Sequence, residues 1–236
     1  MSKIGHKPIF TDEYPSFSPF DRYALRALIR KIDKPFKRIA EIGSWTGKGS
    51  TAAIIEEIRD GSGVLYCIDH WRGNPDVAAH QSLVSKYDMF STFRANVSQC
   101  GGTEIVRPLV MSSRDAAAIT SEHIFDLVFI DGSHSYDETI SDIDLWLPKV
   151  TVGGILCGHD CEGRSETFEA EYLLTNKNRD GVAGNDVFRH IHPGVILAVH
   201  EKFRGRAHLW AEKTIKLENG AVGRSTIWDM FVNDTC

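Results

Sequence analysis

Short runs of apolar, mostly β-branched residues alternate along the chain with longer segments in which apolar residues recur every three or four positions. This alternation is typical of an α/β fold, in which helices cover both faces of a mostly parallel sheet. Strands are predicted at residues 38–42, 64–68, 104–106, 126–130, 155–157, 195–199 and 226–231. Helices are predicted at 21–32, 50–59, 81–97 and 136–147, and the first of them is expected to pack outside the core.

A single domain is expected, because the chain has 236 residues and contains no repeat or low-complexity segment. The stretch from 162 to 184 is polar and poor in aliphatic residues, which predicts an insertion or a lid. The predicted division is a helical extension at 1–35, a core at 36–160, an insertion or lid at 161–186 and C-terminal strands at 187–236.

Composition and charge exclude several classes of protein. The chain is 42% hydrophobic and 25% charged, which is close to the average for globular proteins. Its net charge is -5 and its basic residues are scattered, so a nucleic-acid partner is not expected. The first residues contain no apolar stretch, so no secretory leader is expected, and the longest apolar run, at 195–199, is too short to span a bilayer. The sequence therefore predicts a cytoplasmic protein, and leaves a homo-oligomer open.

The cysteines are odd in number and lack any Cys-x-x-Cys pair, which fits a reducing compartment. They are Cys67, Cys100, Cys157, Cys161 and Cys236. Two of them flank His159, but no second group of ligands accompanies them. Buried or incidental thiols are therefore favoured over a zinc site.

Acidic residues stand where several predicted strands end. They are Glu41, Asp69, Asp131 and Asp160. In an open parallel sheet, ligands bind outside the carboxyl ends of the strands. We therefore expect these four side chains to converge on one edge of the sheet, where they would form part of a binding site.

The turn after the first predicted strand, at 41–50, indicates the kind of cofactor. Its glycines fit neither the Gly-x-Gly-x-x-Gly dinucleotide fingerprint nor a phosphate-binding loop. Glu41 followed by Gly43 and Gly47 instead resembles the S-adenosylmethionine (SAM) methyltransferases of the Rossmann-like class. SAM has no phosphates, and a nearby acid favours its ammonium and sulfonium charges. Asp69 would accept hydrogen bonds from both ribose hydroxyls.

Further cofactor contacts are predicted beside these residues. Ser44 lies in the glycine-rich turn, His70 and Trp71 follow Asp69, and Ser113 follows the third predicted strand. Trp71 and Ser113 are candidates for contacts with the adenine.

A more specific resemblance covers about half of the chain, from residue 39 to 160. It rests on the sequence FIDGSHSY at 129–136, on IDHWRG at 68–73 and on GGILCGHD at 153–160. These segments resemble the metal-dependent O-methyltransferases related to the macrocin and mycinamicin sugar methyltransferases, which have a methyltransferase 24-like domain. The resemblance implies a Rossmann-like fold with a mostly parallel seven-stranded sheet. It also implies a hydroxyl acceptor on a sugar or a glycosylated small molecule.

The same resemblance implies roles for individual residues. Asp131 would bind a divalent metal, most simply Mg²⁺, as well as contribute to the cofactor site. His134 would act as the general base, and Asp160 would complete the metal site. His159 stands where the sugar enzymes carry an acid. An imidazole suits Mn²⁺, Fe²⁺ or Zn²⁺ better than Mg²⁺, and a packing role for His159 is the alternative.

Other interpretations remain open at this point. One is a metal-independent methyltransferase, and another is a non-catalytic SAM-binding domain. An iron oxygenase is disfavoured, because no two-histidine, one-carboxylate pattern is evident in the sequence. The histidines at 190 and 192 are expected to be structural, and Tyr136 and Trp146 are expected to anchor their helix in the core.

Overall fold

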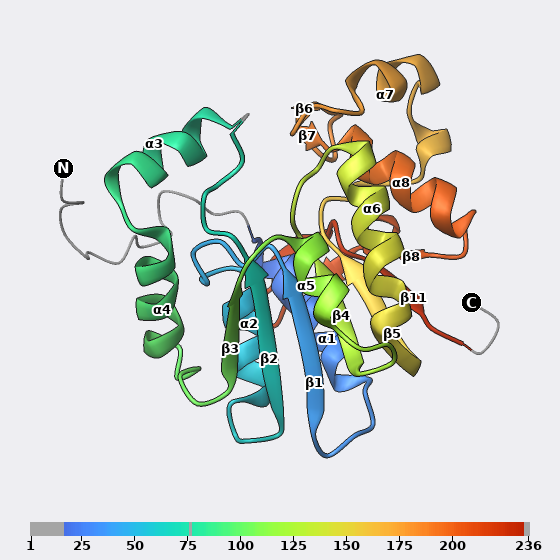
Figure 1. Cartoon of the computed structure of the whole chain (residues 1–236). Coiled ribbons are helices and arrows are strands. Elements are labelled where there is room, and N and C mark those ends of the chain that lie inside the picture. Colours follow the sequence, from blue (N-terminus) through green and yellow to red (C-terminus); the bar gives the residue numbers. More distant parts are fainter. Residues whose placement is uncertain (1–16, 76, 234–236) are drawn as a thin grey trace.

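A seven-stranded sheet forms the centre of the molecule (Figure 1). The computed structural model describes residues 17–75 and 77–233. Its strands are β1 (Lys37–Ile42), β2 (Gly63–Asp69), β3 (Val106–Val110), β4 (Phe125–Ile130), β5 (Val150–Gly158), β8 (His208–Leu209) and β11 (Trp228–Phe231). The strand order is β3-β2-β1-β4-β5-β11-β8. The first five strands in this order pair in parallel, whereas β11 runs antiparallel to both of its neighbours. The predicted α/β class with a mostly parallel sheet is confirmed.

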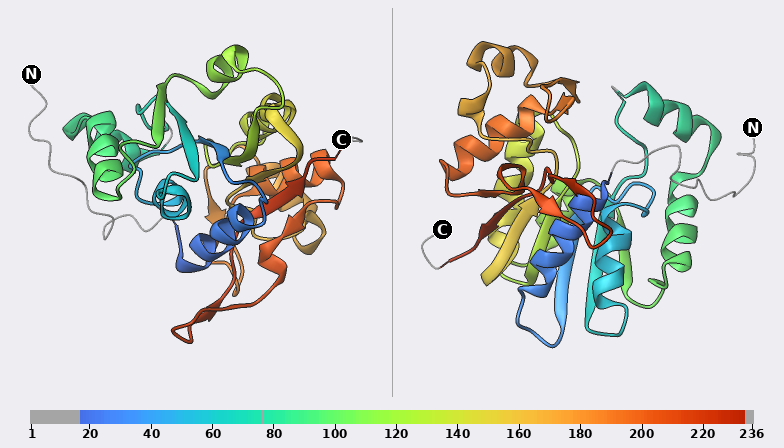
Figure 2. Two further views of the ribbon diagram at one scale, coloured as in Figure 1. Left: turned by 90° about the horizontal axis from the view of Figure 1, so that it is seen from below. Right: turned by 180° about the vertical axis from the view of Figure 1, so that it is seen from behind.

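Helices cover both faces of this sheet, as Figures 1 and 2 show. On one face, α1 (Pro19–Arg30), α2 (Ser50–Ile58) and α4 (Met89–Gln99) contribute to one hydrophobic cluster. On the other face, α5 (Ser113–Ile119), α6 (Tyr136–Trp146) and α8 (Pro193–Phe203) contribute to a second cluster. The central strand β4 is buried along its whole length, as expected of a parallel strand covered on both sides.

The expectation that the first helix lies outside the core is wrong. Leu25 and Leu28 of α1 are fully buried and belong to the same cluster as Ile39 of β1. Its polar side is held on α2 by ion pairs between Arg22 and Glu56 and between Arg30 and Glu57. The helix begins at a capping box formed by Ser18 and Asp21, which fixes where its N-terminus lies.

Three further elements differ from their predictions. The predicted helix at 81–97 is two helices, α3 (Ala78–Lys86) and α4, because Asp88 caps a new helix by accepting a hydrogen bond from the Ser91 N–H. The apolar run at 195–199 lies inside α8 and is not a strand. A short apolar run fits a buried helix as well as a strand, and Pro193 at the first helical position favours the helix. The third strand occupies 106–110, because residues 102–106 form a turn before it.

The segment predicted to be an insertion or lid contains the short helix η3 (Ser165–Thr167), α7 (Ala170–Asn176) and β6 (Val182–Ala183). β6 pairs with β7 (His190–Ile191), and α7 packs against α8. A second hairpin, β9 (Ile215–Lys216) and β10 (Val222–Gly223), precedes β11, and the short helices η2 (Leu147–Lys149) and η4 (Trp210–Glu212) complete the described elements. Within 17–75 and 77–233, no helix is long and apolar enough to cross a membrane.

Candidate active site

The turn that follows β1 lies directly against the residue that follows β4. Gly43 has a φ of 86°, and a Cβ atom at this position would lie 2.1 Å from the carbonyl oxygen of Asp131. Gly47 has a φ of 74° and would place a Cβ 2.9 Å from the ring of Phe93. Only glycine combines this backbone conformation with such close approach. The glycine-rich turn is therefore shaped by its neighbours on both sides.

Asp69, at the end of β2, holds the turns on either side of it. One carboxylate oxygen accepts a hydrogen bond from the N–H of Trp45 at 2.8 Å, and the other accepts from the N–H of Trp71 at 2.6 Å. Trp71 is 5% exposed, and its ring packs on Phe90 and Phe93. Trp71 therefore packs the loop in place, and its contact with a cofactor stays a prediction, as does that of the half-exposed His70.

Two other predicted cofactor residues make internal hydrogen bonds. Glu41 is fully buried and accepts a hydrogen bond from the Thr51 hydroxyl at 2.6 Å, and burial raises the pKa of its carboxyl. Ser113 accepts a hydrogen bond from the Trp146 indole and donates one to Asp142. Trp146 is fully buried, which confirms it as an anchor of α6. Ser44 is also buried, so roles for these residues in cofactor binding stay predictions.

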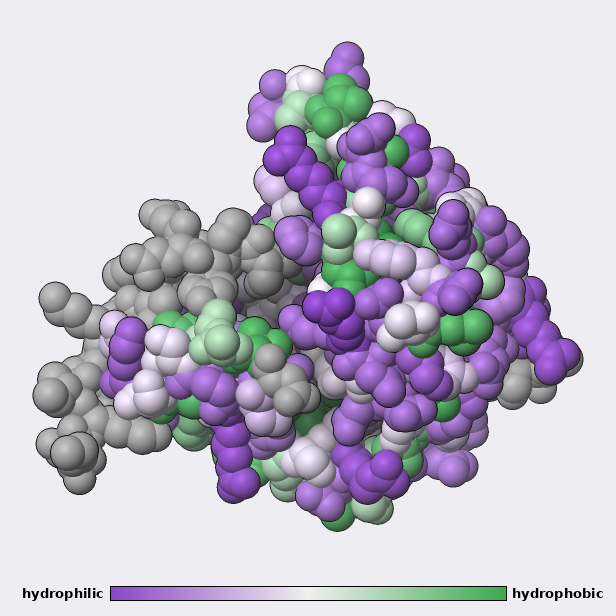
Figure 3. All heavy atoms as spheres, turned by 90° about the horizontal axis from the view of Figure 1, so that it is seen from above, coloured by the Kyte–Doolittle hydropathy of each residue, from purple (hydrophilic) through white to green (hydrophobic). Residues whose placement is uncertain are grey.

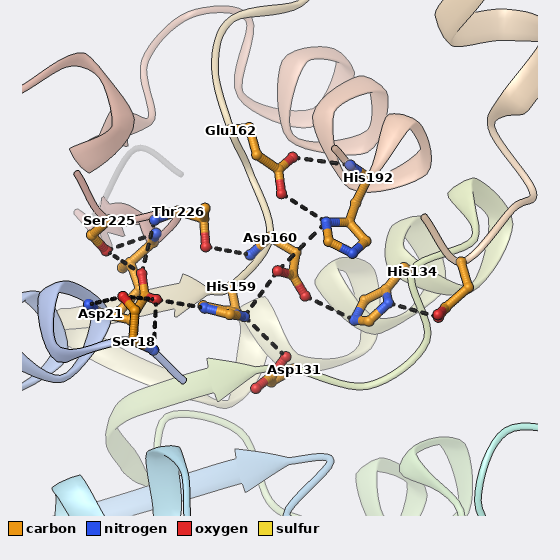
Figure 4. Close-up of polar contacts among 12 residues, drawn as sticks. Ser18, Asp21, Asp131, His134, His159, Asp160, Glu162, His192, Ser225 and Thr226 are labelled. Atoms are coloured by element: carbon orange, nitrogen blue, oxygen red, sulfur yellow. Dashed lines mark hydrogen bonds and ion pairs between the residues drawn. The ribbon is translucent and has the colours of Figure 1, made fainter. Parts of the chain in front are cut away.

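Asp160, just after β5, lies at the centre of a cluster of imidazoles (Figure 4). Its Oδ2 is 3.0 Å from Nε2 of His134, and its Oδ1 is 3.1 Å from Nδ1 of His159 and 3.5 Å from Nδ1 of His192. Nδ1 of His159 also lies 3.6 Å from Asp131. Asp160 has a φ of 61°, an unusual conformation for a residue with a side chain, and such strain is often found at functional sites.

Each imidazole is held by a further carboxylate. Nδ1 of His134 lies 2.8 Å from Asp180, and Nε2 of His159 lies 3.3 Å from Asp21. Nδ1 of His192 lies 2.7 Å from Glu162, which also accepts a hydrogen bond from the backbone N–H of His192. A carboxylate paired with a ring nitrogen of a histidine is common behind metal ligands and catalytic bases, because it fixes the ring.

These contacts shift the pKa values of the cluster. Burial alone would lower the pKa of His134 and His159, but the carboxylates outweigh burial and raise both pKa values well above normal. Burial would likewise raise the pKa of Asp160, but the surrounding imidazoles hold it well below its ordinary value. The carboxylates therefore favour the protonated forms of His134 and His159.

The charges of the cluster favour a cation. It contains five carboxylates, those of Asp21, Asp131, Asp160, Glu162 and Asp180, and the three imidazoles of His134, His159 and His192. With every carboxylate ionised and every imidazole protonated, the sum of five negative and three positive charges is -2. A bound divalent cation would balance it.

The residues predicted as metal ligands are close enough to share an ion. Asp131, His159 and Asp160 each offer one ligand atom, and these atoms lie within 4.8 Å of one another. The set of two carboxylates and one imidazole suits Mn²⁺ or Fe²⁺ and is tolerated by Mg²⁺. Cys157 and Cys161 donate instead to the carbonyl oxygens of Val128 and Gly163, and burial raises both thiol pKa values.

Sequence patterns did not indicate Asp21, Glu162, Asp180 or His192 as parts of this site. His192 was expected to be structural, but it lies beside Asp160, and the fold forms the two-histidine, one-carboxylate group that the sequence does not display, from His134, Asp160 and His192. The four residues that sequence patterns missed come from α1 and from the segments on either side of α7, far apart in the sequence. Only the folded chain brings them together.

A family model described as a methyltransferase domain matches residues 40–161, which is more than half of the chain and includes the glycine-rich turn, Asp131 and Asp160. The chain belongs to this methyltransferase family. It is a SAM-dependent methyltransferase, and its helices and seven-stranded sheet form the Rossmann-like fold of that class. A comparison with curated proteins finds no match in sequence.

Solved structures of methyltransferases share this fold. The O-methyltransferase TomG from Streptomyces achromogenes, in complex with SAM, is 15% identical, with a TM-score of 0.59 over 92% of this chain and 82% of that chain. The O-methyltransferase NovP is 17% identical, with a TM-score of 0.58 over 90% and 79% of the two chains. An O-methyltransferase from Bacillus cereus, in complex with SAH, is 14% identical, with a TM-score of 0.51 over 90% and 80%. At these identities the likeness shows the fold.

Proposed function

We propose that this methyltransferase transfers the methyl group of SAM to a hydroxyl of a sugar or of a glycosylated small molecule, with the help of a divalent cation. The observation that carries the proposal is the contact between Gly43 and Asp131. Gly43 lies in the glycine-rich turn, and Asp131 is one of the carboxylates of the charged cluster. A methyl donor bound at the turn and an acceptor bound at the cluster would therefore be neighbours. TomG and NovP, which share the fold, are O-methyltransferases.

The cofactor would lie along the carboxyl ends of β1 and β2. Gly43, Ser44 and Gly47 give the turn its shape, Asp69 would bind the ribose, and the loop of His70 and Trp71 with Ser113 would border the adenine. Glu41, just before this turn, accepts a hydrogen bond from Thr51 at the start of α2 and so links the two ends of the turn. Its buried negative charge would favour the positive charges of SAM.

Asp131, His159 and Asp160 would hold the cation. A divalent ion there would lower the pKa of an acceptor hydroxyl and, by balancing Asp131 and Asp160, would also lower the pKa of His134. His134 would then accept the hydroxyl proton at Nε2, while Asp180 holds its Nδ1. The acceptor oxygen forms a bond to the methyl carbon as the carbon–sulfur bond breaks, and S-adenosylhomocysteine leaves.

The surface above the strand ends is compatible with a polar acceptor. The described part of this face is mainly hydrophilic (Figure 3). We also propose that the segment at 161–186 acts as a lid, since it supplies Asp180 to the cluster. The chain as a whole, from 1 to 236, would then be one methyltransferase domain.

The proposal is tested by following methyl transfer from radiolabelled SAM to a panel of monosaccharides and glycosides, with Mg²⁺, with Mn²⁺ and with EDTA. We expect at least one hydroxyl acceptor to be methylated only when a divalent cation is present. Transfer that is insensitive to EDTA would instead support a metal-independent methyltransferase. Binding of SAM without transfer to any acceptor would favour a non-catalytic SAM-binding domain.

A further inference from the structure

His134 belongs to a second group of potential metal ligands, separate from the proposed catalytic metal site. Its ring centre is 4.6 Å from that of His192, and both rings face Asp160. His134, Asp160 and His192 each offer a ligand atom within 4.8 Å of the others. This group differs from the proposed catalytic metal site and shares only Asp160 with it.

Glu162 lies behind this group, against the ring of His192. Its Oε1 lies 2.7 Å from Nδ1 of His192, and its side chain is almost fully buried. Two imidazoles and one carboxylate are a donor set that Zn²⁺ accepts when a water fills the fourth position. With both imidazoles neutral, the charges of Asp160 and the nearby Glu162 would balance the charge of Zn²⁺. Mg²⁺ prefers six oxygen ligands and is disfavoured here.

The rings are also held in place as metal ligands usually are. Nδ1 of His134 is paired with Asp180, which leaves Nε2 toward Asp160. A Cβ on Gly194, in the first turn of α8, would lie 2.3 Å from the carbonyl oxygen of His134 and 2.4 Å from that of Lys177. The loop of His134, the end of α7 and the start of α8 are therefore in direct contact. A site with fixed ligands needs little rearrangement to bind an ion.

We propose that His134, Asp160 and His192 form a second cation site, selective for Zn²⁺ or a similar histidine-binding ion, and that an ion there inhibits methyl transfer. The inhibition rests on the proposed role of His134 as the base, whereas binding of the ion does not. Nε2 of His134 cannot coordinate an ion and accept a proton at the same time. Zinc thus removes the base from the reaction.

The test measures Zn²⁺ uptake by chelator competition for the full chain and for three variants. His192→Gln and His134→Gln each remove a ligand, and His190→Gln, two residues away and exposed, is the matched control. We expect the wild type and His190→Gln to bind one more equivalent of Zn²⁺ than the two ligand variants. Losing a ligand should weaken this site by about 100-fold or more. Equal uptake by all four proteins would overturn the site.

Methyl transfer at rising Zn²⁺ then tests the inhibition. We expect His192→Gln to need about 100-fold more Zn²⁺ than the wild type for half inhibition, as its weaker site requires. Thermal unfolding checks that each variant is folded, and zinc binding by His134→Gln gives a second readout. If zinc uptake depends on His192 but no protein transfers methyl groups, the site stands and the proposed function fails. If transfer occurs and zinc inhibits both proteins equally, the inhibitory site is refuted.

Discussion

Nε2 of His159 lies 3.3 Å from a carboxylate oxygen of Asp21, so the N-terminal helix α1 reaches the centre of the candidate active site. Asp21 is also the residue that closes the capping box of α1, and it accepts hydrogen bonds from Ser225 and Thr226. Three parts of the chain therefore meet at one carboxylate. Burial would raise the pKa of Asp21, but His159, Ser18 and Ser225 keep it below its ordinary value.

Replacing Asp21 tests whether this contact serves the metal site. In Asp21→Asn, the charge behind His159 is lost. We expect the affinity for Mn²⁺ to fall by about 10- to 100-fold, as it does when other carboxylates behind metal ligands are replaced. Electron paramagnetic resonance of Mn²⁺ measures this directly. Asp33→Asn, an exposed acid after the same helix, is the control. Unchanged Mn²⁺ affinity in Asp21→Asn would show that Asp21 caps α1 but does not support the metal site.

Replacing Asp131 tests whether methyl transfer can be lost while cofactor binding is kept. We expect Asp131→Asn to lower the rate of methyl transfer by about 100-fold or more, because the cation loses a charged ligand. The affinity for S-adenosylhomocysteine should change by less than about threefold, since the glycine-rich turn keeps its contact with the backbone carbonyl of Asp131. Asp137→Asn, exposed on α6, is the matched control. An equal loss of transfer and of cofactor binding would contradict the metal role of Asp131.

Gly43 and Gly61 allow backbone strain to be separated from the contact with Asp131. Both have positive φ, but a Cβ on Gly61 would meet no atom within 4 Å. We expect Gly61→Ala to cost about 1 kcal/mol of unfolding free energy and to leave cofactor binding intact. Gly43→Ala should cost more and should also weaken binding of S-adenosylhomocysteine, since the Asp131 carbonyl must move. Equal effects of the two variants in denaturation and calorimetry would argue against this contact.

The buried carboxyl of Asp142 should make the protein less stable as the pH rises. Burial raises its pKa to about 6, despite the hydrogen bond from Ser113. The folded state therefore holds this proton more tightly than the unfolded state, where the pKa is near 3.8. Its contribution to stability is complete below that lower value and is lost as the pH rises through about 6.

Asp142→Asn removes this loss, because the amide stays neutral and its oxygen still accepts from Ser113. We expect the difference in unfolding free energy between the variant and the wild type to shift in favour of the variant by about 2–3 kcal/mol from pH 4 to pH 7.5. Urea denaturation at several pH values measures the difference. A difference that does not vary with pH would show that Asp142 titrates normally.

The sheet could be predicted from the sequence because its strands carry a local signal. The run at 127–130 is apolar throughout, and the acids at 131 and 160 follow strands where the topology requires ligands to bind. The run at 195–199 was wrongly predicted, because a short buried run has no period that distinguishes a strand from a helix. The predicted metal ligands do lie together, but no local pattern connects Asp21, Asp180 or His192 to them. Those contacts depend on how α1 and the segment around α7 pack.

Calorimetric titration of S-adenosylhomocysteine into the full chain, with Mg²⁺ and separately with EDTA, measures whether the carboxyl ends of β1 and β2 bind the cofactor. We expect binding with similar affinity under both conditions, because the glycine-rich turn and Asp69 would hold the cofactor without the cation. The absence of binding under both conditions would contradict the assignment of this edge of the sheet as a SAM site.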